Sequence, residues 1–470
     1  GAPFQLAPED LGDAKTPDGR DVKWSRARMI KRAQELRKSF TEDEIKLFAS
    51  PWTAPPWMKA GQSIPARAKG KGMHHDSNGS SMPDEQVVPW VGGKLMPSAY
   101  DDWAAYFARF FKAYESLGIK FWGLTVQNEP DKLPEDKAQH WETMFWTANE
   151  TRDFVKHHLG PVLHCEGLEP AELKDSDFCD YTRKLQIIVH DDQKPQVLDE
   201  MLPILADADA MKYVSGVGLH WYMAPPVDDI DFNKRVRGAN EVPGTPTIFK
   251  NPSILDKTYQ KLKELRHDGF LFGTEACNGF YPMVEKGEAM ASGARLVFGK
   301  DATTHVVKGS FQRGETYAED ILADMSHFVS GWTDWNLVLD EEGGPNWASN
   351  NVDAPILVTS ATEYIRQPMF YYLAHFSRFM PQGSWYVATS KKYVGKPGTF
   401  EFKSSQSMGW PGNVFIEVFY NDEAGHFILQ VLNRERSSKK WMASSGDEAI
   451  WADVPAQSIQ TVIWKPSWLV

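Results

Sequence analysis

Two glutamates lie in sequence settings that suit acid–base chemistry. Glu129 belongs to Thr-Val-Gln-Asn-Glu-Pro at residues 125–130, and Glu275 belongs to Leu-Phe-Gly-Thr-Glu-Ala at residues 271–276. Each follows a short apolar, strand-like run, and a (β/α) barrel presents its catalytic groups at strand ends of this kind. Two carboxyl groups on different strands can flank one glycosidic bond, one as acid and base and the other as nucleophile. The pair therefore indicates glycoside hydrolysis.

Neighbouring side chains support this interpretation. Asn128 is a short amide beside Glu129, which suits it to bind a sugar hydroxyl. Trp52 and Trp335 are predicted at strand ends, where an indole face can stack on a pyranose, although tryptophans also pack in cores. Tyr222 ends another strand and can orient or tune the carboxylate of the nucleophile. The structural alternative for a glutamate at a strand end is a salt-bridged or solvated carboxylate.

The elements that must position these residues alternate between helix-like and strand-like stretches. Residues 100–117 place aromatic side chains on one helical face and stop at Gly118, which suits a left-handed cap. Apolar runs predict strands at residues 46–49, 121–126, 186–190, 214–219, 270–274 and 328–332. This alternation is typical of a parallel sheet with crossover helices.

The alternation ends near residue 380. Short alternating runs follow, separated by Gly, Pro, Asn and Asp, at residues 398–403, 414–420, 426–432 and 458–465. We therefore predict a catalytic (β/α) barrel domain over residues 1–380 and a β-sandwich-like accessory domain over residues 381–470. Residues 60–99 and 284–308 are predicted to be long exposed loops.

Composition excludes several other classes. The net charge of -12 argues against nucleic acid as a partner, because phosphate recognition needs a basic surface. No run of about 18 apolar residues predicts a membrane span. The chain has neither a Walker loop nor a dinucleotide fingerprint, so we expect no nucleotide cofactor.

The cysteines and histidines do not predict a metal site. The three cysteines, Cys165, Cys179 and Cys277, are too few for a disulfide framework and lack zinc-ligand spacing. Cys277 is two residues past Glu275 but has no recognisable histidine partner, so we interpret it as a buried free thiol. The Met-His-His-Asp cluster at residues 73–76 lacks the HExxH spacing and is interpreted as part of a solvated loop.

Several longer segments, taken together, are more specific than any single motif. They are Ala-Ser-Pro-Trp-Thr at 49–53, Phe-Trp at 121–122, Asn-Glu-Pro at 128–130, Gly-Leu-His-Trp-Tyr at 218–222, Thr-Glu-Ala-Cys at 274–277, Gly-Trp-Thr-Asp-Trp-Asn-Leu at 331–337, Gly-Gly-Pro-Asn-Trp at 343–347 and Gln-Pro-Met-Phe-Tyr at 367–371. In this order they resemble the glucosylceramidases, the acid β-glucosidases of glycoside hydrolase family 30. Asn-Glu-Pro alone would indicate only the wider clan of barrel glycosidases.

The resemblance implies a (β/α)8 TIM-type barrel with a C-terminal β-sandwich-like domain. Glu129 would be the general acid and base, and Glu275 the nucleophile of a retaining mechanism, with the two carboxyl groups roughly 5 Å apart. Trp52, Asn128, Trp335 and Asn350 match positions that line the family's glucose pocket. Family members begin with a region that supplies the first two barrel strands, whereas Phe4-Gln5-Leu6 already resembles the loop after the second strand. We therefore expect about strands 3 to 8 in this chain.

The implied activity is hydrolysis of glucosylceramide, with no metal or cofactor. Expected partners are glucosylceramide or another β-glucoside and an anionic lipid surface, in a lysosomal or secreted protein; binding of a saposin-type activator does not follow. Two alternatives stay open. One is another family 30 hydrolase, such as an endo-β-1,6-glucanase or a β-xylosidase, and the other is a non-catalytic glycan- or lipid-binding relative.

Overall fold

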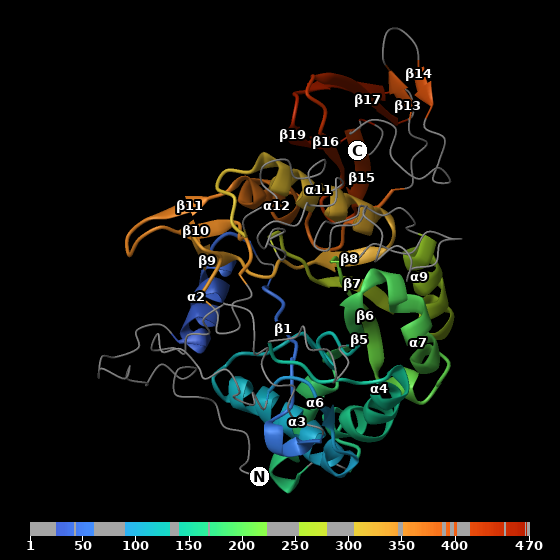
Figure 1. Cartoon of the computed structure of the whole chain (residues 1–470). Coiled ribbons are helices and arrows are strands. Elements are labelled where there is room, and N and C mark those ends of the chain that lie inside the picture. The colour runs from blue at the N-terminus through green and yellow to red at the C-terminus, as the bar shows by residue number, and fades with distance from the viewer. Residues whose placement is uncertain are drawn as a thin grey trace, which may run out of the picture. The chain divides into compact units, whose positions relative to one another are not determined.

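The chain forms two compact units in the computed structural model (Figure 1). Unit 1 comprises Gly1–Asp192, Val197–Gly218 and Gln260–Phe270, and unit 2 comprises Gln193–Gln196, Leu219–Tyr259 and Leu271–Val470. The structure describes residues 25–41, 44–60, 90–131, 141–167, 170–222, 253–279, 305–345, 351–387, 392–394, 399–401, 414–445, 448–465 and 467.

Unit 1 holds four neighbouring strands of the parallel sheet. In order across the sheet they are β1 (Phe48–Ala49), β4 (Gly123–Thr125), β5 (Gln186–Gln193) and β6 (Val214–His220). β1 pairs with β4 and β4 with β5, both in parallel. The apolar runs are strands because both faces are covered: Leu124, Ile187 and Ile188 are at most 1% exposed. The strands predicted at residues 46–49, 121–126, 186–190 and 214–219 are confirmed.

Helix α3 (Tyr100–Ser116) packs its aromatic face in the core of unit 1. Trp103, Phe107, Phe111 and Tyr114 are buried on it. The helix stops before Gly118, whose φ of 74° is left-handed and therefore favours glycine. The helix predicted over residues 100–117 is confirmed within one residue.

The remaining helices lie mostly in unit 1. They are α2 (Arg26–Lys38), α4 (Ala148–Phe154), α5 (Gly160–Leu163), α6 (Ser176–Thr182) and α7 (Val197–Leu205), with α9 (Ser253–Leu265) divided between the units.

The prediction of an exposed loop over residues 60–99 is wrong at its two ends. β2 (Lys59–Ala60) pairs antiparallel with β3 (Lys94–Leu95). The ammonium of Lys59 donates to the Gly92 carbonyl at 2.8 Å, and Val91 is only 3% exposed. Burial of this lysine among backbone carbonyls therefore fixes the C-terminal part of the segment. Residues 61–89, and 284–304 of the other predicted loop, lie outside the described residues.

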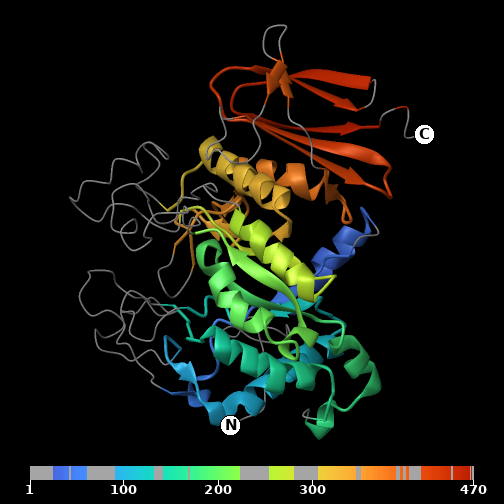
Figure 2. The ribbon, with the colours of Figure 1, turned by 90° about the vertical axis from the view of Figure 1, so that its right-hand side faces the viewer.

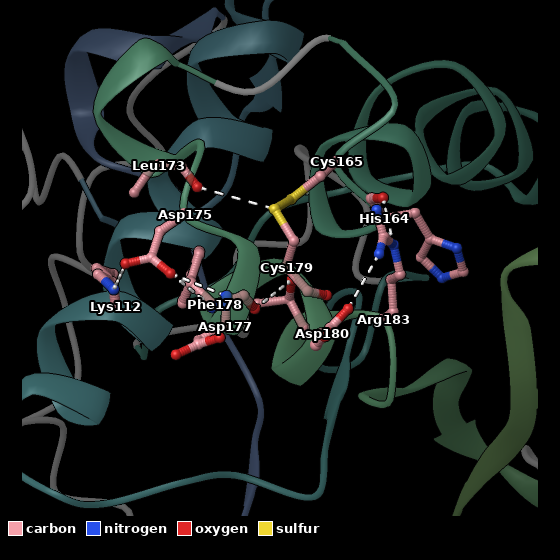
Figure 3. The surroundings of a disulfide bond; sticks show 11 residues. Lys112, His164, Cys165, Leu173, Asp175, Asp177, Phe178, Cys179, Asp180 and Arg183 are labelled. Carbon is pink, nitrogen blue, oxygen red and sulfur yellow. Dashed lines mark hydrogen bonds and ion pairs between the residues drawn. A yellow bond between two sulfur atoms is a disulfide. The ribbon is translucent and has the colours of Figure 1, made fainter.

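A disulfide joins Cys165 to Cys179 in unit 1 (Figure 3). The two Cα atoms are 5.8 Å apart and the sequence separation is 14 residues. Cys179 lies in α6, whose N-cap Asp175 accepts from the Asp177 and Phe178 backbone N–H groups at 2.9 and 3.2 Å. The bridge therefore closes the segment between the end of α5 and α6. It was not predicted from the sequence.

Unit 2 holds the last two parallel strands and two long helices. β7 (Phe270–Glu275) and β8 (Val329–Trp332) pair in parallel with a bulge between Leu271 and Gly273. They agree with the strands predicted at residues 270–274 and 328–332. α11 (Phe311–Ser326) packs against α12 (Pro368–Ser377), and a three-stranded sheet contains β9 (Val338–Asp340), β10 (Ile356–Val358) and β11 (Tyr364–Arg366).

Helix α11 buries charged side chains, each paired with an opposite charge from another segment of unit 2. Lys194 is 2% exposed, and its ammonium contacts Asp320 at 3.1 Å and Asp324 at 2.8 Å. Arg313 pairs with Asp353, and Arg434 pairs with Glu319. The helix is therefore held by buried ion pairs as well as by apolar packing.

The C-terminal residues form antiparallel sheets, which lie beside α11 and α12 in Figure 2. The strands are β12 (Trp385–Tyr386), β13 (Lys392–Val394), β14 (Thr399–Glu401), β15 (Val414–Asn421), β16 (His426–Asn433), β17 (Lys439–Ser445), β18 (Glu448–Val454) and β19 (Ser458–Trp464). Trp441 of β17, 1% exposed, packs on Leu429 and Val431 of β16, which joins two sheets over one core. The predicted β-sandwich-like part is confirmed. None of the helices in the described ranges is long and apolar enough to cross a membrane.

Candidate active site

The carboxylate of Glu275 lies at the end of β7 in unit 2 and accepts a hydrogen bond from Tyr222. The phenol oxygen of Tyr222 is 2.8 Å from Glu275 Oε1. Tyr222 follows β6 and is only 6% exposed, so this bond is shielded from water. A phenol can donate to an ionised carboxylate, and such a charge-assisted bond is stronger than a neutral one. The contact therefore orients the group predicted to be the nucleophile.

Cys277 packs behind the same tyrosine. Its sulfur lies 3.3 Å from the Tyr222 hydroxyl, and its side chain is fully buried. Burial, together with the nearby Glu275 carboxylate, raises the pKa of the Cys277 thiol and that of the Tyr222 phenol well above their usual values. Both groups therefore stay protonated. The cysteine is a buried free thiol, as the sequence predicts, and lacks the thiolate that a nucleophile requires.

The three residues after Glu275 are fixed through their backbone groups. Four hydrogen bonds hold them: Trp335 N to Ala276 O at 2.7 Å, Trp221 Nε1 to Cys277 O at 3.1 Å, Asn278 N to Tyr317 Oη at 3.3 Å, and Asp353 N to Asn278 O at 2.8 Å. The backbone contact of Trp335 places this tryptophan next to the strand end that bears Glu275. Rigid positioning of a reacting group is a requirement of efficient catalysis.

The residue before Trp335, Asp334, has a buried carboxyl group that accepts from the backbone N–H of Trp335. Asp334 accepts from the Tyr317 hydroxyl at 2.9 Å, and burial raises the pKa of Asp334 well above its usual value. The same hydroxyl accepts from Asn278 N. Tyr317 thus links the segment after Glu275 to the turn that carries Trp335.

Glu129 lies four residues past the end of β4 in unit 1. It is 7% exposed and has a φ of 42°, which residues other than glycine and asparagine seldom adopt. Its backbone N–H donates to the Asp191 carbonyl at 3.0 Å. A left-handed residue held in this way is often found at a functional site, where the surrounding contacts offset the local strain.

Asn128 and Trp52 are held beside Glu129 by the chain itself. Asn128 N donates to Pro51 O at 2.9 Å. The amide of Gln127 donates to Trp52 O at 2.7 Å and to Asn128 O at 2.9 Å. The segment after β1 and the segment after β4 are therefore joined directly at the predicted sugar-binding residues.

Two hydroxyl groups and a carboxylate form a relay in unit 1 that the sequence motifs do not predict. Thr125 Oγ1 donates to Ser50 Oγ at 2.7 Å, and Ser50 Oγ donates to Asp191 Oδ2 at 2.7 Å. His190 and Asp191 have φ angles of 72° and 55°. The available signal was the polar run His-Asp-Asp-Gln at residues 190–193, which directly follows the apolar run Ile-Ile-Val at residues 187–189.

Each unit therefore brings three of the predicted residues together. Trp52, Asn128 and Glu129 are adjacent in unit 1, and Tyr222, Glu275 and Trp335 are adjacent in unit 2. Asn350 and the cluster at residues 73–76 lie outside the described residues. The separation of the Glu129 and Glu275 carboxyl groups stays a prediction, as do their catalytic roles. Within the ranges that the structure describes, no group of three or more His, Cys, Asp and Glu side chains could hold a metal ion.

Comparison with known families and proteins adds independent information. Residues 90–380 match the family described as "Glycosyl hydrolase family 30 TIM-barrel domain", in agreement with the predicted barrel. The chain is 35% identical over 428 residues, 90% of its length, to "Putative glucosylceramidase 3" of Caenorhabditis elegans. It is 31% identical over 423 residues to "Lysosomal acid glucosylceramidase" of Mus musculus, again across 90% of its length. These matches cover 62% and 63% of the two relatives, so the chain spans about six-tenths of their length.

More distant relatives share the fold. "Endo-1,6-beta-D-glucanase BGN16.3" of Trichoderma harzianum is 22% identical over 422 residues, 89% of this chain and 64% of that protein. Among solved structures, SrfJ from Salmonella typhimurium superposes with a TM-score of 0.62 at 21% identity, covering 99% of this chain and 80% of the other. This structural likeness agrees with a barrel that carries accessory antiparallel sheets.

Proposed function

Because the chain belongs to glycoside hydrolase family 30, we propose that it is a retaining β-glucosidase that cleaves the glucosidic bond of glucosylceramide. The observation that supports this most directly is the 2.8 Å hydrogen bond from Tyr222 to Glu275, which holds a carboxylate at a barrel strand end. The names of the two glucosylceramidase relatives support the choice of substrate.

In the first chemical step, Glu275 is the nucleophile and Glu129 the acid. The Glu275 carboxylate attacks the anomeric carbon, and the bond from this carbon to the ceramide oxygen breaks. Glu129 gives its proton to that oxygen, so ceramide leaves as a neutral alcohol. Glucose stays attached to Glu275 as an ester.

In the second step, Glu129 acts as a base. Its carboxylate takes a proton from a water molecule, the water oxygen attacks the anomeric carbon, and the bond to Glu275 breaks. Two inversions give glucose in the β configuration, and Glu129 is protonated again. Asn128 would bind a sugar hydroxyl, and the indole faces of Trp52 and Trp335 would stack on the ring.

We propose a lysosomal or secreted location. The Cys165–Cys179 disulfide supports this proposal, because disulfides persist in oxidising compartments and are rare in the cytosol. A lipid aglycone also implies that the enzyme works at a lipid surface. Hydrolysis of glucosylceramide in anionic vesicles tests this implication.

The test is hydrolysis of a fluorogenic β-glucoside and of glucosylceramide in anionic vesicles, across pH 4 to 7. Wild type should cleave both substrates, and Glu275→Gln should lose at least roughly a thousandfold in kcat because the covalent step needs this carboxylate. NMR of early product should show β-glucose. Folding of each protein is checked by circular dichroism.

Two results would contradict the proposal. Cleavage of a β-1,6-glucan without cleavage of glucosylceramide would favour the endo-glucanase alternative, which the fungal relative suggests. Early release of α-glucose would contradict the retaining mechanism whatever the substrate.

A further inference from the structure

The contacts around Glu129 in unit 1 point to a further residue that serves the reaction. We propose that Asp191 is a positioning residue that holds the acid/base glutamate, an inference that rests on the proposed role of Glu129. Asp191 is 1% exposed and lies in β5, next along the sheet from the strand that leads to Glu129.

The backbone of Asp191 makes the first contact. Its carbonyl accepts from the Glu129 N–H at 3.0 Å. Thr125 is the last residue of β4, so Glu129 lies beyond the regular strand pairing and depends on contacts of this kind. Because Glu129 has a φ of 42°, this hydrogen bond helps to keep it in an unfavourable conformation.

The side chain of Asp191 makes the second contact. Its carboxylate accepts from Ser50, just after β1, and Ser50 in turn accepts from Thr125 at the end of β4, both at 2.7 Å. Each hydroxyl in this relay gives its proton toward Asp191, so the relay must end on a group that accepts. A carboxylate meets that requirement, and its bond to a hydroxyl is charge-assisted.

The conformation of Asp191 explains how one residue makes both contacts. His190 and Asp191 are consecutive left-handed residues with φ angles of 72° and 55°. This double turn interrupts the regular alternation of β5. His190 Nδ1 lies 2.9 Å from Glu200 Oε2, which places this turn against α7. The ends of β1, β4 and β5 are thus joined at Asp191.

The test compares two substrates that differ in their need for acid catalysis. A dinitrophenyl β-glucoside has a leaving group that departs without a proton, whereas an alkyl β-glucoside requires one from Glu129. Asp191→Ala should lower kcat/KM for the alkyl glucoside by about 30- to 100-fold and for the dinitrophenyl glucoside by no more than about threefold, since misplacing one catalytic group costs of this order. Ser50→Ala should show the same split, and Asp191→Asn, which still accepts from Ser50, should retain most of the activity.

Controls separate positioning from general damage to the fold. Asp199→Ala, at an exposed site on α7, should leave both substrates unchanged. Equal losses on both substrates in Asp191→Ala would overturn the inference, because a purely structural role reduces the amount of active protein for each substrate alike.

A second measurement does not depend on turnover. Amide hydrogen exchange of peptides that cover residues 126–131 should accelerate at least about tenfold in Asp191→Ala and stay unchanged in α3 and α6 of unit 1. The substitution keeps the Asp191 carbonyl but removes the carboxylate that accepts from Ser50, so the turn that presents this carbonyl to the Glu129 N–H would be held less firmly. Unaltered exchange at this segment would overturn the inference even if the wild type cleaved no glucoside. Failure of the proposed function and failure of the positioning role are therefore distinguishable.

Discussion

At the scale of single residues, Tyr222 has the clearest expected effect on chemistry. Its hydroxyl is the donor to Glu275 at 2.8 Å, and Cys277 lies on its other side at 3.3 Å. Since the tyrosine is buried, removing only its oxygen leaves the ring packing in place. The contribution of the hydrogen bond can therefore be measured separately from the fold.

Tyr222→Phe should lower kcat/KM for a β-glucoside by about 10- to 100-fold, the effect of losing a hydrogen bond to a charged group worth roughly 1.5–3 kcal/mol. Cys277→Ser is the matched control and should change kcat/KM by less than about threefold, because the hydrogen bond of the thiol is with the phenol and not with the Glu275 carboxylate. Steady-state kinetics at matched fold content gives both values. Activity of Tyr222→Phe within twofold of wild type would show that the bond does not assist the reaction.

The residues of the site could be proposed from the sequence because they belong to distinctive segments. Asn128 and Glu129 are adjacent in Asn-Glu-Pro, and Glu275 ends an apolar run. Asp191 could not be found in this way. The polar run at residues 190–193 indicates that this region carries functional side chains, but the contacts of Asp191 depend on two left-handed residues inside β5, and the residue types do not predict such a turn.

At the scale of elements, α11 is a helix whose burial the sequence pattern does not predict. Strands in the parallel sheet were predictable because their apolar runs are buried on both faces. In α11 the charged residues are buried as well, among them Arg313, Glu319 and Asp324. A helix of this composition normally indicates an exposed face. Its burial depends on opposite charges from distant segments, namely Lys194, Asp353 and Arg434, which only the tertiary structure provides.

The buried cluster of α11 makes the stability of the protein depend on pH. Burial, with Asp320 nearby, raises the pKa of Asp324 to about 7. Asp in an unfolded chain has a pKa of about 4. Between about pH 4 and pH 7 the folded state therefore binds one proton more than the unfolded state at Asp324. Because of this extra proton, the free energy of unfolding decreases as the pH rises through that range. Urea unfolding of wild type should therefore give a free energy of unfolding whose contribution from Asp324 declines from pH 4 toward pH 7.

Asp324→Asn, which cannot ionise, should flatten this part of the pH profile. Glu423→Gln, at an exposed position of the β15–β16 turn, should keep the wild-type slope. A slope in Asp324→Asn equal to that of wild type would assign the pH dependence to other groups.

At the scale of the whole molecule, the arrangement of parallel strands followed by antiparallel sheets was predictable, and the disulfide was not. Apolar periodicity gives the order of elements, but the spacing of two cysteines says nothing about the 5.8 Å between their Cα atoms. The division at residues 380 and 381 stays a prediction. Membership of family 30 agrees with the segments that were matched between about residues 45 and 380.

Replacing Cys165 and Cys179 together by serine should lower the free energy of unfolding by about 2–4 kcal/mol, because the bridge restricts the unfolded chain. Urea unfolding with and without reductant is the measurement. Reductant should destabilise wild type by a similar amount and leave the double variant unaffected. A double variant as stable as oxidised wild type would show that the bridge contributes no net stability.

The state of the three cysteines also makes local unfolding of unit 2 measurable. Cys165 and Cys179 are joined in the disulfide. Cys277, two residues past Glu275, is a buried free thiol in contact with Tyr222. A thiol reagent added to the native, oxidised protein can thus react only when unit 2 opens around Glu275. The labelling rate of this one sulfur atom then reports how often the surroundings of Glu275 unfold locally, with no probe introduced and no substrate required.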